Sequence, residues 1–177
     1  MTQTSLQIFP QFTTKRLKLR RLLMSDCEDV FMLRTDKKVN KFIERPISRR
    51  DKNGAEFITR IHKSIADNNI YHWVISLQEN TKLLGTICLW NFNKNREVVE
   101  VGYDLFPQYQ GQGIMTEALN AVLDFGFNTA SFKTIEAFTH KDNKASKKLL
   151  IKNGFLQDEN RKDRENTNNI IFIKQND

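Results

Sequence analysis

Apolar and polar side chains alternate along some stretches of the 177-residue chain and recur every three to four residues along others, which predicts a mixture of strands and helices. Alternating or β-branched runs bounded by turn-forming residues predict strands over residues 16–22, 71–77, 83–92, 97–106, 134–139, 156–160 and 170–174. Helical spacing predicts one helix over residues 55–66 and another from the glycine-rich stretch near residue 113 to about residue 127. Short polar turns join the three strands between residues 71 and 106, so we expect an antiparallel meander there.

Capping signals predict two shorter helices. Ser25 and Glu28 have the spacing of a capping box, with Ser25 at the N-cap. Asp142 or Asn143 would cap the second short helix. Gly154 would end that helix as its C′ residue, because glycine adopts the left-handed conformation this position needs.

The chain shows no internal repeat, linker or low-complexity tract, so residues 1–177 are expected to form a single domain. The order of elements predicts an α/β (α+β) fold, with a mixed, mainly antiparallel sheet of six to seven strands flanked by about four helices. The connection between the strands at 97–106 and 134–139 is long enough for a parallel crossover. The irregular stretch over residues 35–50 has the length of a binding loop.

A glycine-rich turn, Gln110-Gly111-Gln112-Gly113, lies where the strand pattern stops and the helical pattern begins. Its glycines permit a tight turn that exposes consecutive amide N–H groups. The following helix adds unpaired N–H groups and the positive end of its dipole. We therefore expect a cradle for a phosphate or diphosphate. The turn lacks the Lys-Ser/Thr pair of a P-loop and the glycine spacing of a Rossmann fingerprint, which disfavours a nucleotide-binding protein.

The composition indicates a globular protein with a basic surface. Hydrophobic residues make up 39% of the chain and 13 residues are Phe, which argues against disorder. The net charge of +7 suits a polyanionic cofactor, an acidic protein or a nucleic acid. No cluster of Lys and Arg with interleaved aromatic residues supports the nucleic acid. Trp73, Trp90 and Phe92 are expected in the core.

Cysteine and histidine spacing gives no sign of a metal site. Cys27 and Cys88 match no metal or redox motif, and we expect both to be reduced thiols. His62, His72 and His140 form no ligand spacing. The chain begins without a signal peptide and contains no apolar run of transmembrane length, so no membrane association and a cytoplasmic location are expected.

Taken together, the order of elements and several groups of residues resemble the GCN5-related N-acetyltransferases (GNAT). The family signature is Gln or Arg, two residues, Gly, one residue, then Gly or Ala; Gln110 and Gly113 fit, and Met115 replaces the final small residue. The wider pattern resembles the branch that acetylates ribosomal-protein N-termini, the RimJ/RimL type. That pattern is Glu100-Val101-Gly102-Tyr103, Gln110-Gly111-Gln112-Gly113-Ile114-Met115-Thr116-Glu117-Ala118, Asn143-Lys144-Ala145-Ser146 and Asn153-Gly154-Phe155. The resemblance covers nearly the whole chain.

The resemblance implies acetyl-CoA as cosubstrate, no metal, and an amine acceptor that is either a protein N-terminus or a small molecule, in a monomer or a homodimer. Acetyl-CoA would lie where the strand at 97–106 splays from the strand at 134–139, and such splaying commonly involves a β-bulge in the first strand. An amide near Leu105 would polarise the thioester carbonyl. The implied cofactor-binding residues are Leu105, Phe106, Gln108, Gln110, Gly111, Gln112, Gly113, Ile114, Asn143 and Ser146.

Acetyl transfer requires a base for the amine, a polarised carbonyl and a stabilised leaving thiolate. The resemblance implies that Ser146 stabilises the leaving thiolate by a hydrogen bond and that Asn143 bridges the cofactor arm and the short helix. The alternatives are that Ser146 bonds only local backbone groups and that Asn143 is a plain N-cap. Glu100 and Glu165 compete for the role of base. Each could equally be a solvated charge, and water or another group could act instead. Neither cysteine lies in the motif region, so we expect direct transfer in a ternary complex.

Two rival functions stay open. The same enzyme could acetylate a polyamine, an aminoglycoside or another small amine, because the segments expected to bind the acceptor carry no recognisable motif. A non-catalytic acyl-CoA-binding module would keep the cradle but would need neither Ser146 nor a base.

Overall fold

The structure, a computed structural model, describes residues 9–43 and 54–176. Its strands are β1 (Phe12–Thr13), β2 (Leu17–Arg21), β3 (Tyr71–Leu77), β4 (Gly85–Trp90), β5 (Val98–Leu105), β6 (Thr134–His140), β7 (Leu156–Asp158) and β8 (Asn169–Gln175). Its α-helices are α1 (Cys27–Thr35), α2 (Gly54–Ala66), α3 (Ile114–Asp124) and α4 (Lys144–Lys152), and short 3₁₀ turns form η1 (Met24–Asp26), η2 (Val39–Phe42) and η4 (Pro107–Tyr109). Each strand expected from the sequence is present, and the two-residue β1 is too short to show a periodicity.

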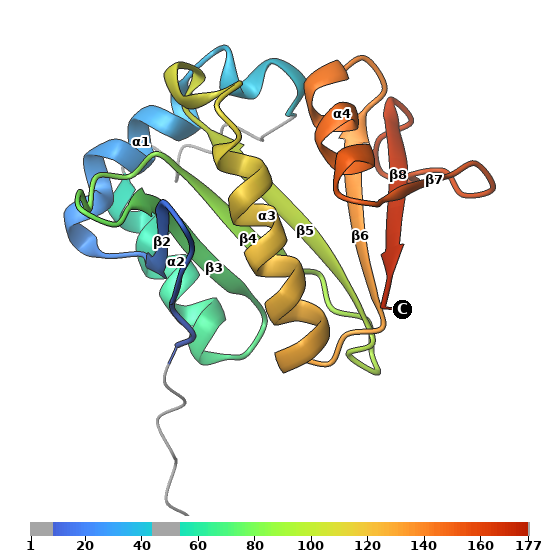
Figure 1. Ribbon diagram of the computed structural model, residues 1–177, viewed down its shortest axis with the longest axis horizontal. Helices are drawn as coiled ribbons and strands as arrows, with labels where there is room; N and C mark the ends of the chain where they lie inside the picture. The colour runs from blue at the N-terminus through green and yellow to red at the C-terminus, as the bar shows by residue number, and fades with distance from the viewer. Residues whose placement is uncertain (1–8, 44–53, 177) are drawn as a thin grey trace, which may run out of the picture.

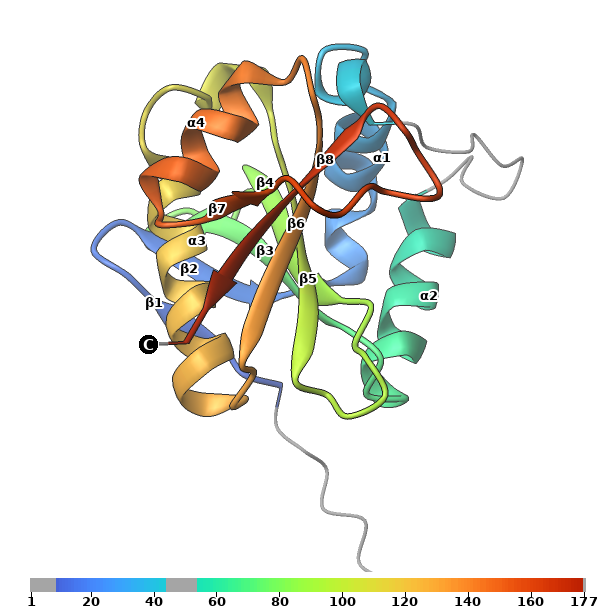
Figure 2. The ribbon, with the colours of Figure 1, turned by 90° about the vertical axis from the view of Figure 1, so that its right-hand side faces the viewer.

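The eight strands of the described residues form one sheet in the order β1-β2-β3-β4-β5-β6-β8-β7. β5 and β6 are parallel, and the other neighbouring pairs are antiparallel. α3 and α4 cover one face of the sheet, and α1 and α2 cover the other (Figures 1 and 2). The expected single α/β domain, with its meander followed by a crossover, is therefore confirmed.

Two apolar clusters attach the helix layers to the sheet. In β3, Trp73 and Ile75 belong to the cluster under α3 and α4, whereas Val74 belongs to the cluster under α1 and α2. All three side chains are fully buried. This alternation follows from the strand geometry, which points successive side chains to opposite faces. The core is thus divided by the sheet, and each face can carry its own chemistry.

The sheet separates between β5 and β6. These strands pair only at Val98–Thr134, Val99–Ile135 and Glu100–Glu136. Beyond this point β5 stays paired with β4, and β6 stays paired with β8 along its whole length. Figure 1 shows β5 and β6 close at their lower ends and apart at their upper ends. The V-shaped opening expected between these strands is present.

The expected β-bulge is absent from the ladder between β4 and β5. The register runs without interruption from Trp90–Glu100 to Gly85–Leu105. A bulge would place two residues of one strand opposite one residue of the other and would shift this register. The expectation of a bulge was wrong, because the strands diverge by following different partners rather than by a local distortion.

The capping box predicted at Ser25 is also wrong. A 3₁₀ turn, η1, precedes α1, and its third residue is Asp26. The carboxylate of Asp26 accepts a hydrogen bond from the Leu23 N–H (2.8 Å). By contrast, the predicted ends of α4 are confirmed: Asn143 is the N-cap, and Gly154 follows the helix with a φ of +80°. Of the predicted loop over residues 35–50, residues 44–50 lie outside the described residues.

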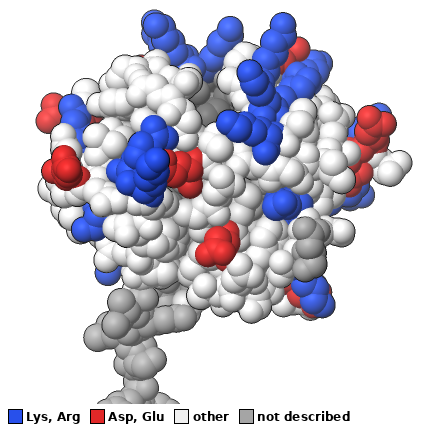
Figure 3. Space-filling model, viewed as in Figure 1, with Lys and Arg blue, Asp and Glu red and all other residues white. Residues whose placement is uncertain are grey.

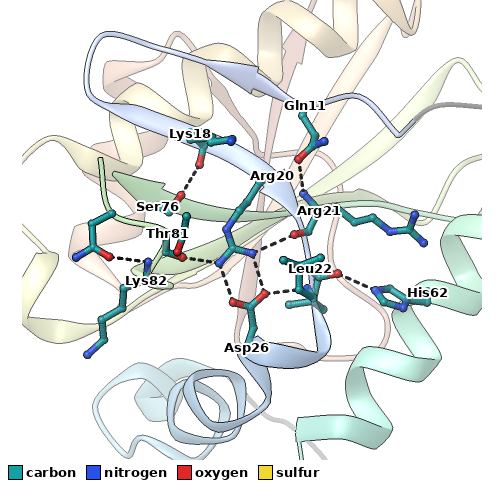
Figure 4. A network of polar contacts seen from close by, with 12 residues as sticks. Gln11, Lys18, Arg20, Arg21, Leu22, Asp26, His62, Ser76, Thr81 and Lys82 are labelled. Atoms are coloured by element: carbon teal, nitrogen blue, oxygen red, sulfur yellow. Dashed lines mark hydrogen bonds and ion pairs between the residues drawn. The ribbon is translucent and has the colours of Figure 1, made fainter. Parts of the chain in front are cut away.

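A buried ion pair joins β2 to the helix layer below it (Figure 4). The two terminal nitrogens of Arg20 donate to the two carboxylate oxygens of Asp26 at 2.8 and 2.7 Å. Nη2 of Arg20 also donates to the Thr81 carbonyl (2.6 Å) in the turn between β3 and β4. The side chains of Arg20 and Asp26 are only 6% and 7% exposed. The pair therefore fixes the position of η1 and α1 against the sheet.

Replacing Asp26 by Asn should lower the free energy of unfolding by about 3 to 5 kcal/mol, because the Arg20 guanidinium would stay buried without its charge partner. Urea denaturation followed by circular dichroism measures the change. Lys133→Ala is the control, since it removes an ion pair to Glu97 in which the Lys133 side chain is 72% exposed. That change should cost less than about 1 kcal/mol. Equal effects of the two substitutions would contradict the role given to Asp26.

Candidate active site

The turn between β5 and α3 carries consecutive backbone amides that have no acceptor in the part of the chain that the structure describes. Gly111 and Gly113 have φ values of +74° and +75°, which glycine adopts without steric cost. The first helical bond of α3 runs from the Glu117 N–H to the Gly113 carbonyl (3.0 Å). Among the described residues, no N–H of residues 111–116 donates to another protein group. Together with the positive end of the α3 dipole, these amides can hold a phosphate or diphosphate.

Arg16, just before β2, fixes the back of this turn. Its guanidinium donates from Nε to Glu117 Oε2 (2.7 Å) and from Nη1 to the Gln112 carbonyl (3.1 Å). Thr14 Oγ1 donates to Glu117 Oε1 (2.5 Å). Partial burial alone would raise the pKa of Glu117, but these hydrogen bonds outweigh it and hold the pKa below its ordinary value. Because the C=O and N–H of a trans peptide point in opposite directions, the bond to Gln112 turns the Gly113 N–H away from Arg16.

A cleft of about 1580 Å³ opens where β5 and β6 diverge. Its lining comes from β5, β6, the start of α4 and the connection between β7 and β8, and on the other side from α1, α2 and η2. The polar residues that line it include the three expected to be catalytic, Glu100, Ser146 and Glu165. The cleft is also lined by Tyr103, Asp104, His140, Asn143 and Asp163.

β5 presents free backbone groups to this opening. The Phe106 N–H donates to the Leu84 carbonyl (3.0 Å) and so extends the ladder between β4 and β5. Because alternate residues of an antiparallel strand bond to the same neighbour, the amides of Tyr103 and Leu105 point toward β6. β6 pairs with β5 only as far as Glu100, so these amides face the opening. The amide expected near Leu105 is available, whereas Phe106 offers no free N–H and its ring is buried in the core.

Ser146 lies in the first turn of α4, held there by the N-cap. Its N–H donates to Asn143 Oδ1 (3.1 Å), and its hydroxyl is hydrogen-bonded to the hydroxyl of Tyr103 (2.8 Å). Burial raises the pKa of Tyr103 to about 12, against the smaller opposing effect of the Ser146 hydrogen bond. Tyr103 therefore keeps its proton at neutral pH.

Glu100 lies on the opposite face of β5 from Tyr103. Burial raises the pKa of Glu100 from its ordinary value of 4.5 to about 7, against the lowering effect of a hydrogen bond from Asn91 Nδ2 (3.2 Å). Neighbouring carboxylates add to the rise, and these are Asp163, Glu136 and Glu165. A carboxyl group with a pKa near 7 can accept a proton at neutral pH and release it again.

Glu165, the other expected base, lies in the same cleft but in a different environment. It is exposed in the connection between β7 and β8. Its N–H donates to Asp163 Oδ1 (2.9 Å), and Asp163 in turn accepts a hydrogen bond from the Asn169 amide (2.8 Å). Both carboxylates therefore line one cleft, but Glu100 is partly buried and Glu165 is exposed.

Comparison with known proteins identifies the family and the fold. The family model of the acetyltransferase (GNAT) domain matches residues 16–156, a span that contains the cradle, the opening and Ser146. The chain belongs to the GNAT acetyltransferases. Its relatives include the uncharacterized N-acetyltransferase YoaA of Bacillus subtilis, which is 25% identical over 151 residues that make up 85% of each chain.

Solved structures share the fold of this acetyltransferase. The ribosomal-protein-S5-alanine acetyltransferase of Vibrio fischeri superposes with a TM-score of 0.76 at 23% identity, over 95% of this chain and 97% of that one. RimL, a ribosomal L7/L12 α-N-protein acetyltransferase solved with coenzyme A, gives a TM-score of 0.78 at 15% identity, over 94% and 98% of the two chains. At these identities the likeness is one of fold.

Within the GNAT fold, the expected cofactor-binding residues do not all offer a free donor. Gln110 is already engaged, because its N–H donates to the Pro107 carbonyl (3.2 Å) and its side-chain amide donates to the Leu105 carbonyl (2.9 Å). Gln108 accepts a hydrogen bond from the side chain of Gln112 at its carbonyl (2.7 Å). These contacts shape the turn, and the free amides begin at Gly111.

Sequence reasoning missed some residues of this cleft. Strand alternation in the sequence places Tyr103 on the apolar face of its strand, with Val101 and Leu105, and only the hydrogen bond across the opening to Ser146 indicates another role. Trp90 was expected in the core, but it is 43% exposed and lines the cleft, so that expectation was wrong. Asn91 follows the end of β4 with a φ of +52°, and this turn aims its amide at Glu100.

The described part of the chain contains neither a cluster of metal-binding side chains nor a helix that could span a membrane. Within residues 9–43 and 54–176, no three His, Cys, Asp or Glu side chains are grouped so that they could hold a metal ion. None of the helices in that part of the chain is long and apolar enough to span a bilayer. Neither Cys27 nor Cys88 forms a disulfide among the described residues.

Glu100→Gln should stabilise the protein at high pH. The folded state holds the pKa of Glu100 at about 7, above its ordinary value of 4.5, so ionisation costs stability as the pH rises between these values. At about pH 8 the Gln variant should be more stable by about 2 to 3 kcal/mol, and at about pH 4 the two proteins should be equal. Urea titrations at both pH values measure this difference.

Glu165→Gln is the control, because the Glu165 side chain is exposed. Its stability should track that of the wild type at both pH values. A Glu100→Gln variant with no gain at high pH would show that Glu100 is not desolvated.

Proposed function

We propose that this protein is an acetyl-CoA-dependent N-acetyltransferase that acetylates the α-amine of a protein N-terminus by direct transfer in a ternary complex. One observation carries the proposal. The free amides of the glycine-rich turn lead to an opening through the sheet, and the Ser146 hydroxyl and the Glu100 carboxyl reach that opening from opposite faces.

The binding groups suit acetyl-CoA. The amides of residues 111–116 match a diphosphate, and the free backbone groups of Tyr103 and Leu105 match the amide-containing arm. Figure 3 shows Lys and Arg side chains gathered at the edge of the molecule over α4, which carries Lys144, Lys147 and Lys148. This positive edge suits the phosphates of CoA. The CoA complex of the structurally similar RimL supports the same ligand.

The residues at the opening supply the chemistry that transfer requires. Acetyl-CoA brings the acetyl group and loses CoA as a thiolate. As the amine nitrogen bonds to the carbonyl carbon, Glu100 takes the amine proton, directly or through water. The Leu105 N–H stabilises the negative charge on the carbonyl oxygen. When the C–S bond breaks, its electron pair stays on sulfur, and the Ser146 hydroxyl donates a hydrogen bond to the thiolate.

The pKa of Glu100 favours an α-amine as the acceptor. A protein α-amine has a pKa of about 8, so transfer of its proton to a group with a pKa of about 7 is uphill by only about 1.4 kcal/mol. An alkylamine such as a lysine side chain has a pKa of about 10.4, which raises this cost to about 5 kcal/mol. Glu100 is therefore a better base for a protein N-terminus than for a polyamine.

An acceptor panel tests the function. Acetyl-CoA is mixed with peptides that have a free N-terminus and no lysine, with N-terminally blocked lysine peptides, and with polyamines and aminoglycosides, and free thiol is measured. We expect turnover with the free N-terminus. Turnover only with polyamines or aminoglycosides would establish the small-amine enzyme instead. Binding of acetyl-CoA without turnover on any acceptor would favour a non-catalytic acyl-CoA-binding module.

The rate profile should identify the base. In the wild type, kcat/KM should rise with pH through two ionisations, one at about 7 from Glu100 and one near 8 from the free α-amine. Glu100→Gln should lower kcat/KM by about 100-fold or more and keep only the ionisation of the amine. Glu165→Gln should keep both. If Glu165→Gln alone lost the ionisation at about 7, Glu165 and not Glu100 would be the base.

Arg16→Ala should weaken CoA binding, because the Gln112 peptide would lose the hydrogen bond that orients it. Loss of one such bond corresponds to an increase in Kd of about 3- to 10-fold, measured by calorimetry. Arg96→Ala removes the same charge far from the turn, where Arg96 donates to the Asn68 carbonyl, and should leave Kd unchanged. Equal weakening of CoA binding in both variants would show that Arg16 acts only through the net charge of the protein.

A further inference from the structure

The hydrogen bond between Tyr103 and Ser146 joins the two sides of the opening. Tyr103 lies on β5 beyond Glu100, the last residue of that strand to pair with β6. Ser146 lies at the start of α4, on the chain that follows β6. Their hydroxyl oxygens are 2.8 Å apart, and both residues line the cleft. This contact therefore sits where a thioester in the opening would meet the protein.

The donor in this contact follows from the chemistry of the two hydroxyls. The structure allows either hydroxyl to donate, but a phenol is a stronger acid than an aliphatic alcohol and therefore the stronger donor, which favours Tyr103 as the donor and Ser146 as the acceptor. The Ser146 backbone N–H is already bonded to Asn143, which fixes the turn. Within the described residues, Ser146 Oγ has no other partner, so its own proton is left for a ligand.

We infer that Tyr103 is a positioning residue for the leaving group: it donates to Ser146 Oγ and so directs the Ser146 proton to the sulfur of CoA. This inference rests on the proposed function. A donor bonded to Ser146 also polarises the serine hydroxyl and strengthens the bond that it donates in turn. Burial keeps Tyr103 protonated, so the arrangement persists across the working pH range.

The protons stay on both oxygens during transfer. Burial raises the pKa of Tyr103 to about 12. A CoA thiol resembles a cysteine thiol, whose pKa is about 8.5, so proton transfer from the phenol to the thiolate would be uphill. The electron pair of the C–S bond goes to sulfur, the two hydroxyls stabilise that charge by hydrogen bonds, and the thiolate takes a proton from water after release.

Bound CoA itself provides a test that needs no acceptor. The thiol of CoA is titrated in the complex by the ultraviolet absorbance of the thiolate, with the protein alone as blank. We expect the pKa of the bound thiol to lie below that of free CoA, and Tyr103→Phe to return it toward the free value. Tyr71→Phe is the matched control, because Tyr71 stacks on Trp73 in β3 and lies outside the cleft.

Other titratable groups line the same cleft, but wild type and Tyr103→Phe share all of them, so the difference between the two thiol pKa values isolates the phenol. They are Arg34, Arg60, His72, Cys88, Glu100, Asp104, His140, Arg161, Lys162, Asp163, Arg164 and Glu165. An unchanged thiol pKa in Tyr103→Phe would overturn the inference while leaving the proposed function intact. Failure of the wild-type protein to bind CoA would instead overturn the proposed function.

Kinetics provide the second test. Tyr103→Phe should lower kcat about ten-fold with KM values for both substrates within about two-fold, because only the charge that develops on sulfur is affected. In a Ser146→Ala background the same substitution should have no further effect, since Tyr103 acts through Ser146. Equal losses in both backgrounds would show a merely structural role and would overturn the inference.

Discussion

The short pairing between β5 and β6 is the constraint on which the rest of the site depends. Each strand keeps a long ladder with its other neighbour, β4 or β8, so the two halves of the sheet diverge as the strands run on. A complete ladder between them would consume the backbone groups of Tyr103 and Leu105 and close the passage between the faces. The opening is built from regular strands and needs no bulge.

Strand alternation then assigns different tasks to the two faces. Tyr103 points to the side of α3 and α4, where the cradle and Ser146 lie, and Glu100 points to the side of α1 and α2. Two reactants can therefore approach from opposite faces and meet in the opening. The desolvation that raises the pKa of Glu100 to about 7 suits this carboxyl to the proposed role of base, and it also destabilises the protein when Glu100 is ionised.

Polar contacts of β2 and of the residues just before it hold elements on both faces of the sheet. Just before the strand, Arg16 and Thr14 bind Glu117 and so hold the start of α3 beside the glycine-rich turn. Within the strand, Arg20 binds Asp26 and holds η1 and α1 on the other side of the sheet. The first pair is partly exposed and orients a loop, whereas the second is buried and fixes a layer. Both are pairs of an arginine and a carboxylate, so the difference between their roles follows from their different burial.

The sequence by itself determined the features that local patterns encode. These are the strands and helices, the glycine-rich turn, the Asn143 cap and the Gly154 terminator, because each depends on residues within a few positions of one another. Local reasoning failed at Ser25, because the neighbouring Asp26 carboxylate accepts the Leu23 N–H and pairs with Arg20 on β2. It also failed at Trp90, which lies at the end of a strand beside the cleft.

Only the tertiary structure decided the divergence of β5 and β6, the contact between Tyr103 and Ser146, and the difference between Glu100 and Glu165. Pairing, desolvation and contact across the opening are set by residues far apart in the chain, so no local pattern contains them. Both carboxylates are candidates for the base from the sequence, and only the folded chain shows that Glu100 is desolvated whereas Glu165 is exposed.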